Sequence, residues 1–248
     1  MTEEPYRWLE AVANRRDYVR EQLKGGSPVF AASLQDGILL LGVGSGQSKV
    51  FELFDRHALA GLGHPADIEK IRQAAIDAAH MEAFTRAPED VSLRRLVSFG
   101  LSPQLKTNFE QIFSAPFLVE LLLAELGSKP AEDLLFRLHF DGSFQSHAGG
   151  CVVAGNHSES EARVQRWLRE QLAAGADRAH AAELLLQAWW WMTTSPSGNE
   201  PPGEADRKAG WRETLKERIV EAGWLDRTTR RLARYESLSL ATLALKAP

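Results

Sequence analysis

The chain has 248 residues, of which 44% are hydrophobic and 25% charged, and its formal net charge is −4. This length and apolar content are enough for a sizeable core, in one large domain or two small ones. The small net charge gives no reason to expect nucleic acid or an acidic membrane surface as the main partner.

Three further features favour a cytoplasmic protein. The single cysteine, Cys151, cannot form an internal disulfide, which suits a reducing compartment. No apolar run approaches the roughly 20 residues that a membrane span needs. The N-terminus is charged and lacks the apolar core of a signal peptide.

The first part of the chain predicts one helix followed by two pairs of strands. Apolar residues recur at helical spacing over residues 5–24, and Gly25-Gly26 ends this helix. Asp36-Gly37 then lies between two aliphatic runs, which is a strong signal for a hairpin. A second pair of short strands is expected at 50–54 and 58–62.

Two helices and a group of strands are expected next. One helix begins near Pro65, where proline suits the first turn, and another covers 91–113 with a bend at Ser102-Pro103. The run 117–125 is almost continuously apolar, which is typical of a strand buried on both faces. Further strands are expected at 134–140, 143–145 and 151–155.

The last part returns to helices and then to strands. Helices are expected at 159–173 and 177–192, followed by an exposed loop over 194–210. Strands at 217–224 and 230–235 and a short helix at 238–245 end the chain. Runs of strands between runs of helices predict an α+β domain of three or four layers, with packed sheets covered by helices.

Four segments, in this order and spacing, resemble the core subunits of the proteasome, which belong to the N-terminal-nucleophile hydrolase superfamily. They cover residues 24–43, 49–63, 137–143 and 152–155. The resemblance implies an αββα sandwich of four layers with an N-terminal helix. Residues 1–26 would form a gate segment and this helix, and residues 27–248 the sandwich domain.

The resemblance also separates the two types of subunit. Catalytic β-type subunits need a threonine as the first residue of the mature chain, assisted by an aspartate and a lysine. Aligned on Asp36-Gly37, these positions hold Ser27, Val43 and Lys49. Because the threonine and the acid are missing and the helix over 5–24 resembles the uncleaved helix of α-type subunits, the resemblance implies a non-catalytic, actinobacterial-like α-type subunit.

An α-type subunit of this family implies particular partners. It forms a heptameric ring, stacks on a ring of β-type subunits and binds an activator, usually a ring ATPase. The resemblance gives Lys49 the task of receiving the activator's C-terminal carboxylate, to which a compact cation is suited. The alternative is an ordinary surface lysine at the start of a strand.

The N-terminal segment of such a subunit lies over the ring pore as a gate. Pro5, Tyr6 and Arg7 match the family's Tyr-Asp-Arg triplet only in part. The first helix would contact neighbouring subunits through the apolar residues Trp8, Val12 and Leu23. These three residues could instead cover the subunit's own sheet.

Two other interpretations of the family resemblance stay open. After cleavage at Gly26-Ser27, Ser27 could act as a nucleophile with Lys49 nearby, although Val43 and Pro28 argue against this. A free-standing scaffold of the same fold is the other. The histidines are scattered and form no helical pair or cysteine cluster, so no metal site and no cofactor are expected.

Two clusters of large residues have structural explanations. The run Trp189-Trp190-Trp191 lies on a predicted helix, where three consecutive side chains point in different directions. We expect a buried pair with the third at a subunit interface, and an aromatic ligand patch as the lesser alternative. Four arginines between 227 and 234 are expected on a solvated sheet edge that discourages strand addition.

Overall fold

The computed structural model describes residues 4–155, 158–195, 197–198, 200–201, 218–239 and 243. The described strands form two five-stranded antiparallel sheets. The first sheet has the order β10-β9-β2-β1-β8, and the second has the order β3-β4-β5-β6-β7.

The strands of the first sheet are β1 (Val29–Leu34), β2 (Gly37–Gly44), β8 (Cys151–Ala154), β9 (Ile219–Asp226) and β10 (Tyr235–Leu238). Those of the second sheet are β3 (Val50–Phe54), β4 (His57–Gly63), β5 (Val119–Glu125), β6 (Leu134–His139) and β7 (Phe144–Ala148). The helices are α1 (Glu4–Leu23), α2 (Pro65–Thr85), α3 (Leu93–Arg95), α4 (Ser102–Glu110), α5 (Ser158–Leu172) and α6 (Arg178–Thr194). Short 3-10 turns cover Pro88–Asp90 and Pro130–Glu132.

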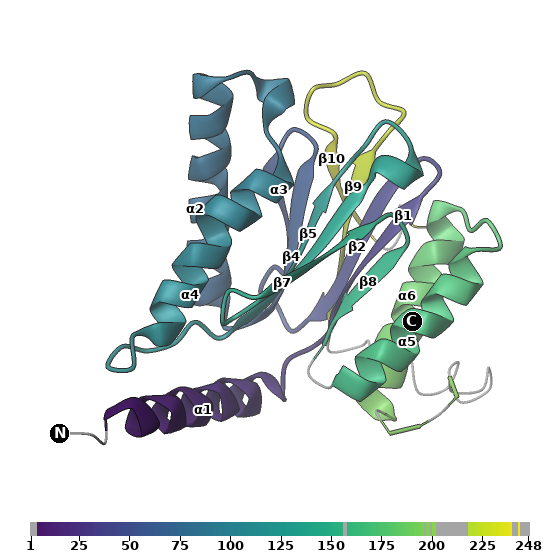
Figure 1. The fold of residues 1–248 in the computed structure, drawn as a ribbon. Coiled ribbons are helices and arrows are strands. Elements are labelled where there is room, and N and C mark those ends of the chain that lie inside the picture. Colours follow the sequence, from purple (N-terminus) through teal and green to yellow (C-terminus); the bar gives the residue numbers. More distant parts are fainter. Residues whose placement is uncertain are drawn as a thin grey trace.

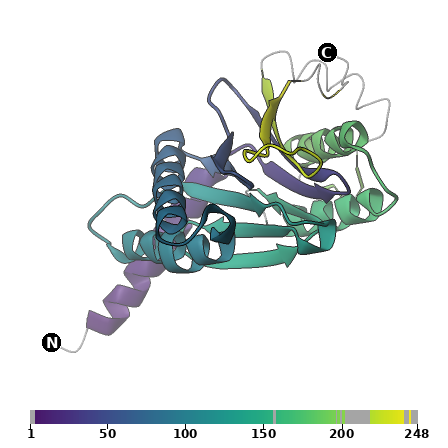
Figure 2. The ribbon, with the colours of Figure 1, turned by 90° about the horizontal axis from the view of Figure 1, so that it is seen from above.

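The two sheets pack face to face between two layers of helices (Figures 1 and 2), which confirms the predicted αββα sandwich. Helices α2 to α4 cover the second sheet, and α5 and α6 cover the first. Separate apolar layers fill the spaces between each sheet and its helices and between the two sheets. Helix α1 lies across one end of the strands (Figure 1). We call this end of the sandwich the α1 end.

Local sequence signals explain the central strands. Every residue of β2 is buried, as its unbroken apolar run suggests. The predicted hairpin of β1 and β2 forms, but its turn consists of Gln35 and Asp36, and Gly37 is already the first residue of β2. A Cβ on Gly37 would lie 2.1 Å from the main-chain oxygen of Leu225. The start of β2 therefore needs a residue without a side chain where it pairs with β9.

The predicted helix over 91–113 is divided into parts. A short α3 leads into a π-helical turn at Leu96–Leu101, and α4 begins at Ser102. Pro103 lies in the first turn of α4, where its missing N–H costs least. Proline therefore marks a change of helix type here rather than a bend in one continuous helix.

The last strand begins later than expected, at Tyr235 instead of residue 230. The carboxylate of Asp226 accepts hydrogen bonds from the main-chain N–H groups of Thr228 and Thr229. The guanidinium of Arg234 donates to the carbonyls of Arg227 and Thr229. These contacts hold 227–234 as a loop. Most of the expected loop at 194–210 and helix at 238–245 lies outside the described residues.

The structure corrects the expectation for the three tryptophans. Trp189, Trp190 and Trp191 are 1%, 7% and 2% exposed, so all three are buried within the chain. Helix α6 contacts both α5 and the first sheet, and it is apolar on almost all sides. None of the three side chains is therefore left for a subunit interface.

The arginines of the β9–β10 region are also not simply a solvated edge. Arg227 forms an ion pair of 2.8 Å with Asp133, whose side chain is fully buried. This pair joins the first sheet to the connection between β5 and β6. Within the described part of the chain, no helix combines the length and apolar character of a membrane span.

Candidate functional site

The α1 end brings together Ser27 and Lys49, as the sequence alignment on Asp36-Gly37 predicts. Ser27 precedes β1 and Lys49 precedes β3. The Lys49 ammonium donates a hydrogen bond of 3.4 Å to the main-chain oxygen of Ser27. A Cβ on Gly42 or Gly44 would lie 3.3 Å from carbons of the Lys49 side chain, so glycines on β2 leave room for the lysine.

A carboxylate on β9 fixes the main chain around Lys49. Glu221 Oε2 accepts hydrogen bonds from the main-chain N–H groups of Lys49, at 2.7 Å, and Val50, at 3.4 Å. Burial lowers the pKa of the Lys49 ammonium, and the charge of Arg218 lowers it further, whereas the charge of Glu221 raises it. Lys49 is thus a half-buried cation near a second cation and one carboxylate.

The Ser27 hydroxyl has a partner that cannot act as a base. Trp189 Nε1 donates to Ser27 Oγ over 2.8 Å, and an indole N–H only donates. The nitrogen of Ser27 lies in the peptide bond after Gly26, at a tightly packed junction. A Cβ on Gly26 would lie 2.8 Å from the Leu62 side chain. Val43, at the expected acid position, is buried in the apolar layer beneath α5 and α6.

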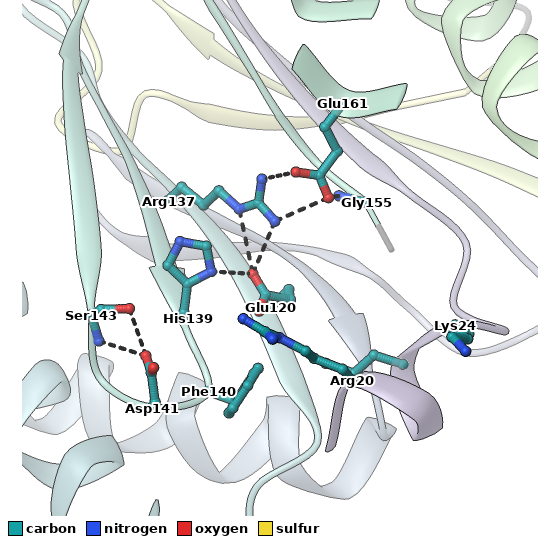
Figure 3. A pocket seen from close by; sticks show the side chains of 11 residues that line it. Arg20, Lys24, Glu120, Arg137, His139, Phe140, Asp141, Ser143, Gly155 and Glu161 are labelled. Carbon is teal, nitrogen blue, oxygen red and sulfur yellow. Dashed lines mark hydrogen bonds and ion pairs between the residues drawn. The ribbon is translucent and has the colours of Figure 1, made fainter. Parts of the chain in front are cut away.

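A cavity of about 510 Å³ also lies at the α1 end, between the last turn of α1 and the ends of β5, β6 and β8 (Figure 3). Sequence reasoning did not find it. Its wall contains Arg137, which forms ion pairs with both Glu120 and Glu161. His139 Nδ1 lies 2.8 Å from Glu120 Oε2. Arg20 reaches from α1 into the same space (Figure 3).

The two carboxylates of this network are buried, at 5% exposure for Glu120 and 6% for Glu161. Together they raise the pKa of Arg137 although burial opposes them. Glu161 also accepts a hydrogen bond of 3.1 Å from the main-chain N–H of Gly155. The network therefore ties the second sheet to the end of β8 and the first turn of α5.

Only the strand register could have revealed this network. Glu120 on β5 pairs directly with His139 on β6, and Arg137 lies two residues earlier on the same face of the strand. That face points into the layer between the sheets, where Leu122 and Leu135 are buried. The alternation of charge along β6 is visible in the sequence, but its partners are not.

Arginine side chains attach α1 to the end of the sandwich. Arg15 donates to the main-chain oxygens of Asn108, at 3.1 Å, and Ser114, at 2.7 Å. Arg16 lies 3.5 Å from the carboxylate of Asp141. The helix is therefore held against the segment that follows α4 and against the β6–β7 turn.

The residues expected to face neighbouring subunits lie in different surroundings. Trp8 is 45% exposed, whereas Val12 is half-buried against the layer between the sheets. Leu23 is 5% exposed and belongs to that layer. It therefore covers the subunit's own sheets, which is the alternative to a contact with a neighbouring subunit. Arg7 is exposed near the start of α1. The side chains of Pro5 and Tyr6, and all of residues 1–3, lie outside the described part.

Over the residues that the structure describes, no three histidine, cysteine or acidic side chains are grouped so that they could hold a metal ion. The charged groups near Ser27 are the Lys49 ammonium, Arg218 and the carboxylate of Glu221, which is occupied by two main-chain N–H groups. Such a set can bind an anion in a partly desolvated position.

The sandwich of two antiparallel sheets between helices, with a serine before the start of β1 and a lysine before the start of β3, is the architecture expected of the N-terminal-nucleophile hydrolase fold. No protein-family model matches the chain. It is similar to curated proteins named proteasome subunit alpha. The one from Nocardioides sp. is 32% identical over 179 residues, which are 71% of this chain and 68% of that protein.

Two further relatives have the same name. The protein from Streptomyces griseus is 29% identical over 200 residues, covering 80% of this chain and 71% of the relative. The protein from Kineococcus radiotolerans is 29% identical over 227 residues, covering 90% and 88%. The chain belongs to the proteasome subunit alpha family.

Proposed function

We propose that this chain is a non-catalytic subunit of the outer ring of a cytoplasmic proteasome. It would form a heptameric ring, stack on a ring of catalytic β-type subunits and restrict the passage of substrates into the proteolytic chamber. Residues 1–26 would supply the gate segment and the first helix, and residues 27–248 the sandwich. Exposed Trp8 on α1 is the best candidate for a contact with the next subunit.

The absence of catalysis is supported by the surroundings of Ser27. An N-terminal nucleophile needs a free amine as base and a hydroxyl that can lose its proton. Here the described partner of the hydroxyl is Trp189 Nε1, which donates to Ser27 Oγ and cannot accept its proton. The ammonium of Lys49 contacts the Ser27 carbonyl, not its hydroxyl.

The docking of an activator is carried by one observation: Lys49 is a half-buried ammonium held over two glycines with a single described hydrogen bond, to Ser27. An ammonium has three donors, so the remaining donors can meet an incoming carboxylate. We propose that this carboxylate is the C-terminus of a ring ATPase. Partial burial strengthens such a contact relative to one in water.

The first prediction tests this assignment with Lys49→Gln. Losing a charge-assisted hydrogen bond to a carboxylate should weaken binding of the ring ATPase by about tenfold to a hundredfold. Binding is measured by surface plasmon resonance on assembled particles.

Lys129→Gln is the matched control, because Lys129 is 66% exposed and pairs with Glu132 far from the α1 end. It should leave binding unchanged. Equal affinities for the wild type and Lys49→Gln, in particles that remain assembled, would show that Lys49 does not receive the activator.

A further inference from the structure

We propose that Arg218 is the second cation of the carboxylate site at Lys49, so that one incoming C-terminal carboxylate is shared by an ammonium and a guanidinium. This inference rests on the proposed docking of an activator at Lys49. It adds a residue from the far end of the sequence, directly before β9.

The strand register brings the start of β9, directly after Arg218, to this place. The residue after it, Ile219, pairs with Gly44 on β2. The end of the Lys49 side chain lies over the same glycine. Two residues further along β9, Glu221 holds the main-chain N–H of Lys49. The start of β9 therefore places Glu221 on the same face as Lys49, and Arg218 directly before the strand, on the alternate face beside Trp189.

A chain of contacts connects the two cations. The Arg218 guanidinium carbon lies 5.8 Å from the centre of the Trp189 ring, within the range of a cation–π contact. The same indole donates to Ser27 Oγ, and the carbonyl of Ser27 accepts from Lys49. Trp189 is buried and fixed, so it supports an otherwise exposed arginine beside the site.

The charges around Lys49 are not balanced, so this position can bind an anion. Throughout the described residues, neither Lys49 nor Arg218 has an ion pair with a carboxylate, and Glu221 Oε2 is used by two main-chain N–H groups. The repulsion between the cations contributes to the lowered pKa of Lys49. Two cations and one carboxylate leave one net positive charge, which matches a single carboxylate.

Arginine adds geometry to this charge. A guanidinium can donate two parallel hydrogen bonds to one carboxylate, and a stacked guanidinium keeps its edge free for them. The lysine then supplies a compact charge from the other side. The shared chemistry is that of a carboxylate, whether from a chain terminus or from an acidic side chain.

The test uses assembled particles and the C-terminal decapeptide of the ring ATPase, labelled with a fluorophore at its N-terminus, as free acid and as amide. Fluorescence anisotropy gives the dissociation constant for the wild type, Lys49→Gln, Arg218→Gln and the double variant. Arg218→Gln should weaken binding of the free acid by about tenfold. The amide should bind weakly to all four. Because both cations share one carboxylate, the double variant should lose less than the product of the single losses.

Arg230→Gln, at an exposed arginine of the β9–β10 loop, is the control for charge alone and should not change binding. Arg218→Lys keeps the positive charge but cannot donate two parallel hydrogen bonds to one carboxylate. Its affinity for the free acid should therefore lie between those of the wild type and Arg218→Gln. It also keeps the test valid if Arg218→Gln does not assemble.

The outcomes separate the two proposals. If Lys49→Gln weakens binding and Arg218→Gln does not, the role of Arg218 is wrong and the proposed function stands. If Arg218→Gln weakens the acid and the amide equally, Arg218 does not contact the carboxylate. If the free acid and the amide bind equally well to the wild type, an acidic side chain or other contacts dominate, and both proposals for the terminus fail.

Discussion

Individual charged residues fasten the two sheets to each other at both ends of the sandwich. At the α1 end, Arg137 lies between two carboxylates from different elements. At the opposite end, Asp133 accepts hydrogen bonds from Ser33 Oγ, at 2.6 Å, and from the N–H of Gly127, at 2.9 Å, and pairs with Arg227. Each carboxylate is buried, so each contributes only while its partners remain.

Asp133→Asn is expected to destabilise the fold. The amide keeps the shape of the side chain but leaves the guanidinium of Arg227 without its buried counter-charge. Removing one partner of a buried pair costs about 3 kcal/mol in the free energy of unfolding. Urea unfolding at pH 7 measures this loss. Asp17→Asn, on an exposed position of α1, is the control. Similar losses in both variants would contradict the account of the pair.

The lowered pKa of Lys49 predicts how binding depends on pH. Only the ammonium form binds a carboxylate, and it is present below the pKa of Lys49. Burial brings that pKa below the ordinary value of 10.5. As the pH rises, affinity for the free-acid peptide should therefore begin to fall at a lower pH than it would if Lys49 had the pKa of an ordinary lysine. Lys49→Arg should keep its affinity over this range, because a guanidinium stays charged. Constant affinity of the wild type up to pH 10.5 would contradict the assignment.

At the scale of helices and strands, the sequence predicts those elements whose positions depend on local sequence signals. The Asp36-Gly37 hairpin, the buried strand β5 and the paired helices α5 and α6 all lie close to their expected positions. These elements follow from turn chemistry and apolar periodicity. The start of β10 does not, because side-chain contacts of Asp226 and Arg234 extend the preceding loop.

The candidate site, like the fold, could be predicted only in part from the sequence. Ser27 and Lys49 follow from their spacing relative to Asp36-Gly37. Arg218, Glu221 and Trp189 could not be found in this way, because sheet register and helix packing bring them to the site from more than a hundred residues away. Burial of all three tryptophans likewise depends on the two surfaces that enclose α6.

In its middle turns, helix α1 is attached to the sandwich through Arg15, Arg16 and the half-buried Val12. Arg15→Ala removes the hydrogen bonds to the carbonyls of Asn108 and Ser114. Opening of α1 should then become easier, and trypsin should cleave after Arg16 or Arg20 about tenfold faster while the sandwich stays intact. Limited proteolysis with mass spectrometry follows this. Arg94→Ala, at an exposed residue of α3, should leave the rate unchanged. Unchanged cleavage in Arg15→Ala would mean that other contacts hold the helix.

At the scale of the whole molecule, the α1 end concentrates the features that distinguish this subunit. It carries the attached helix, the Ser27–Lys49 contact and the ionic network beneath α1. A subunit that restricts the passage of substrates and binds an activator needs a persistent helix and a charged surface at this end. A self-processing hydrolase needs the same end free of the helix, with Ser27 as its first residue.

The most direct measurement is therefore the mass of the purified chain, denatured and native, alone and with a co-expressed β-type subunit. The account predicts an uncleaved chain in ring-sized particles that contain both subunits. A chain that begins at Ser27 would contradict the non-catalytic role. An uncleaved monomer that does not associate with the β-type subunit would contradict the ring.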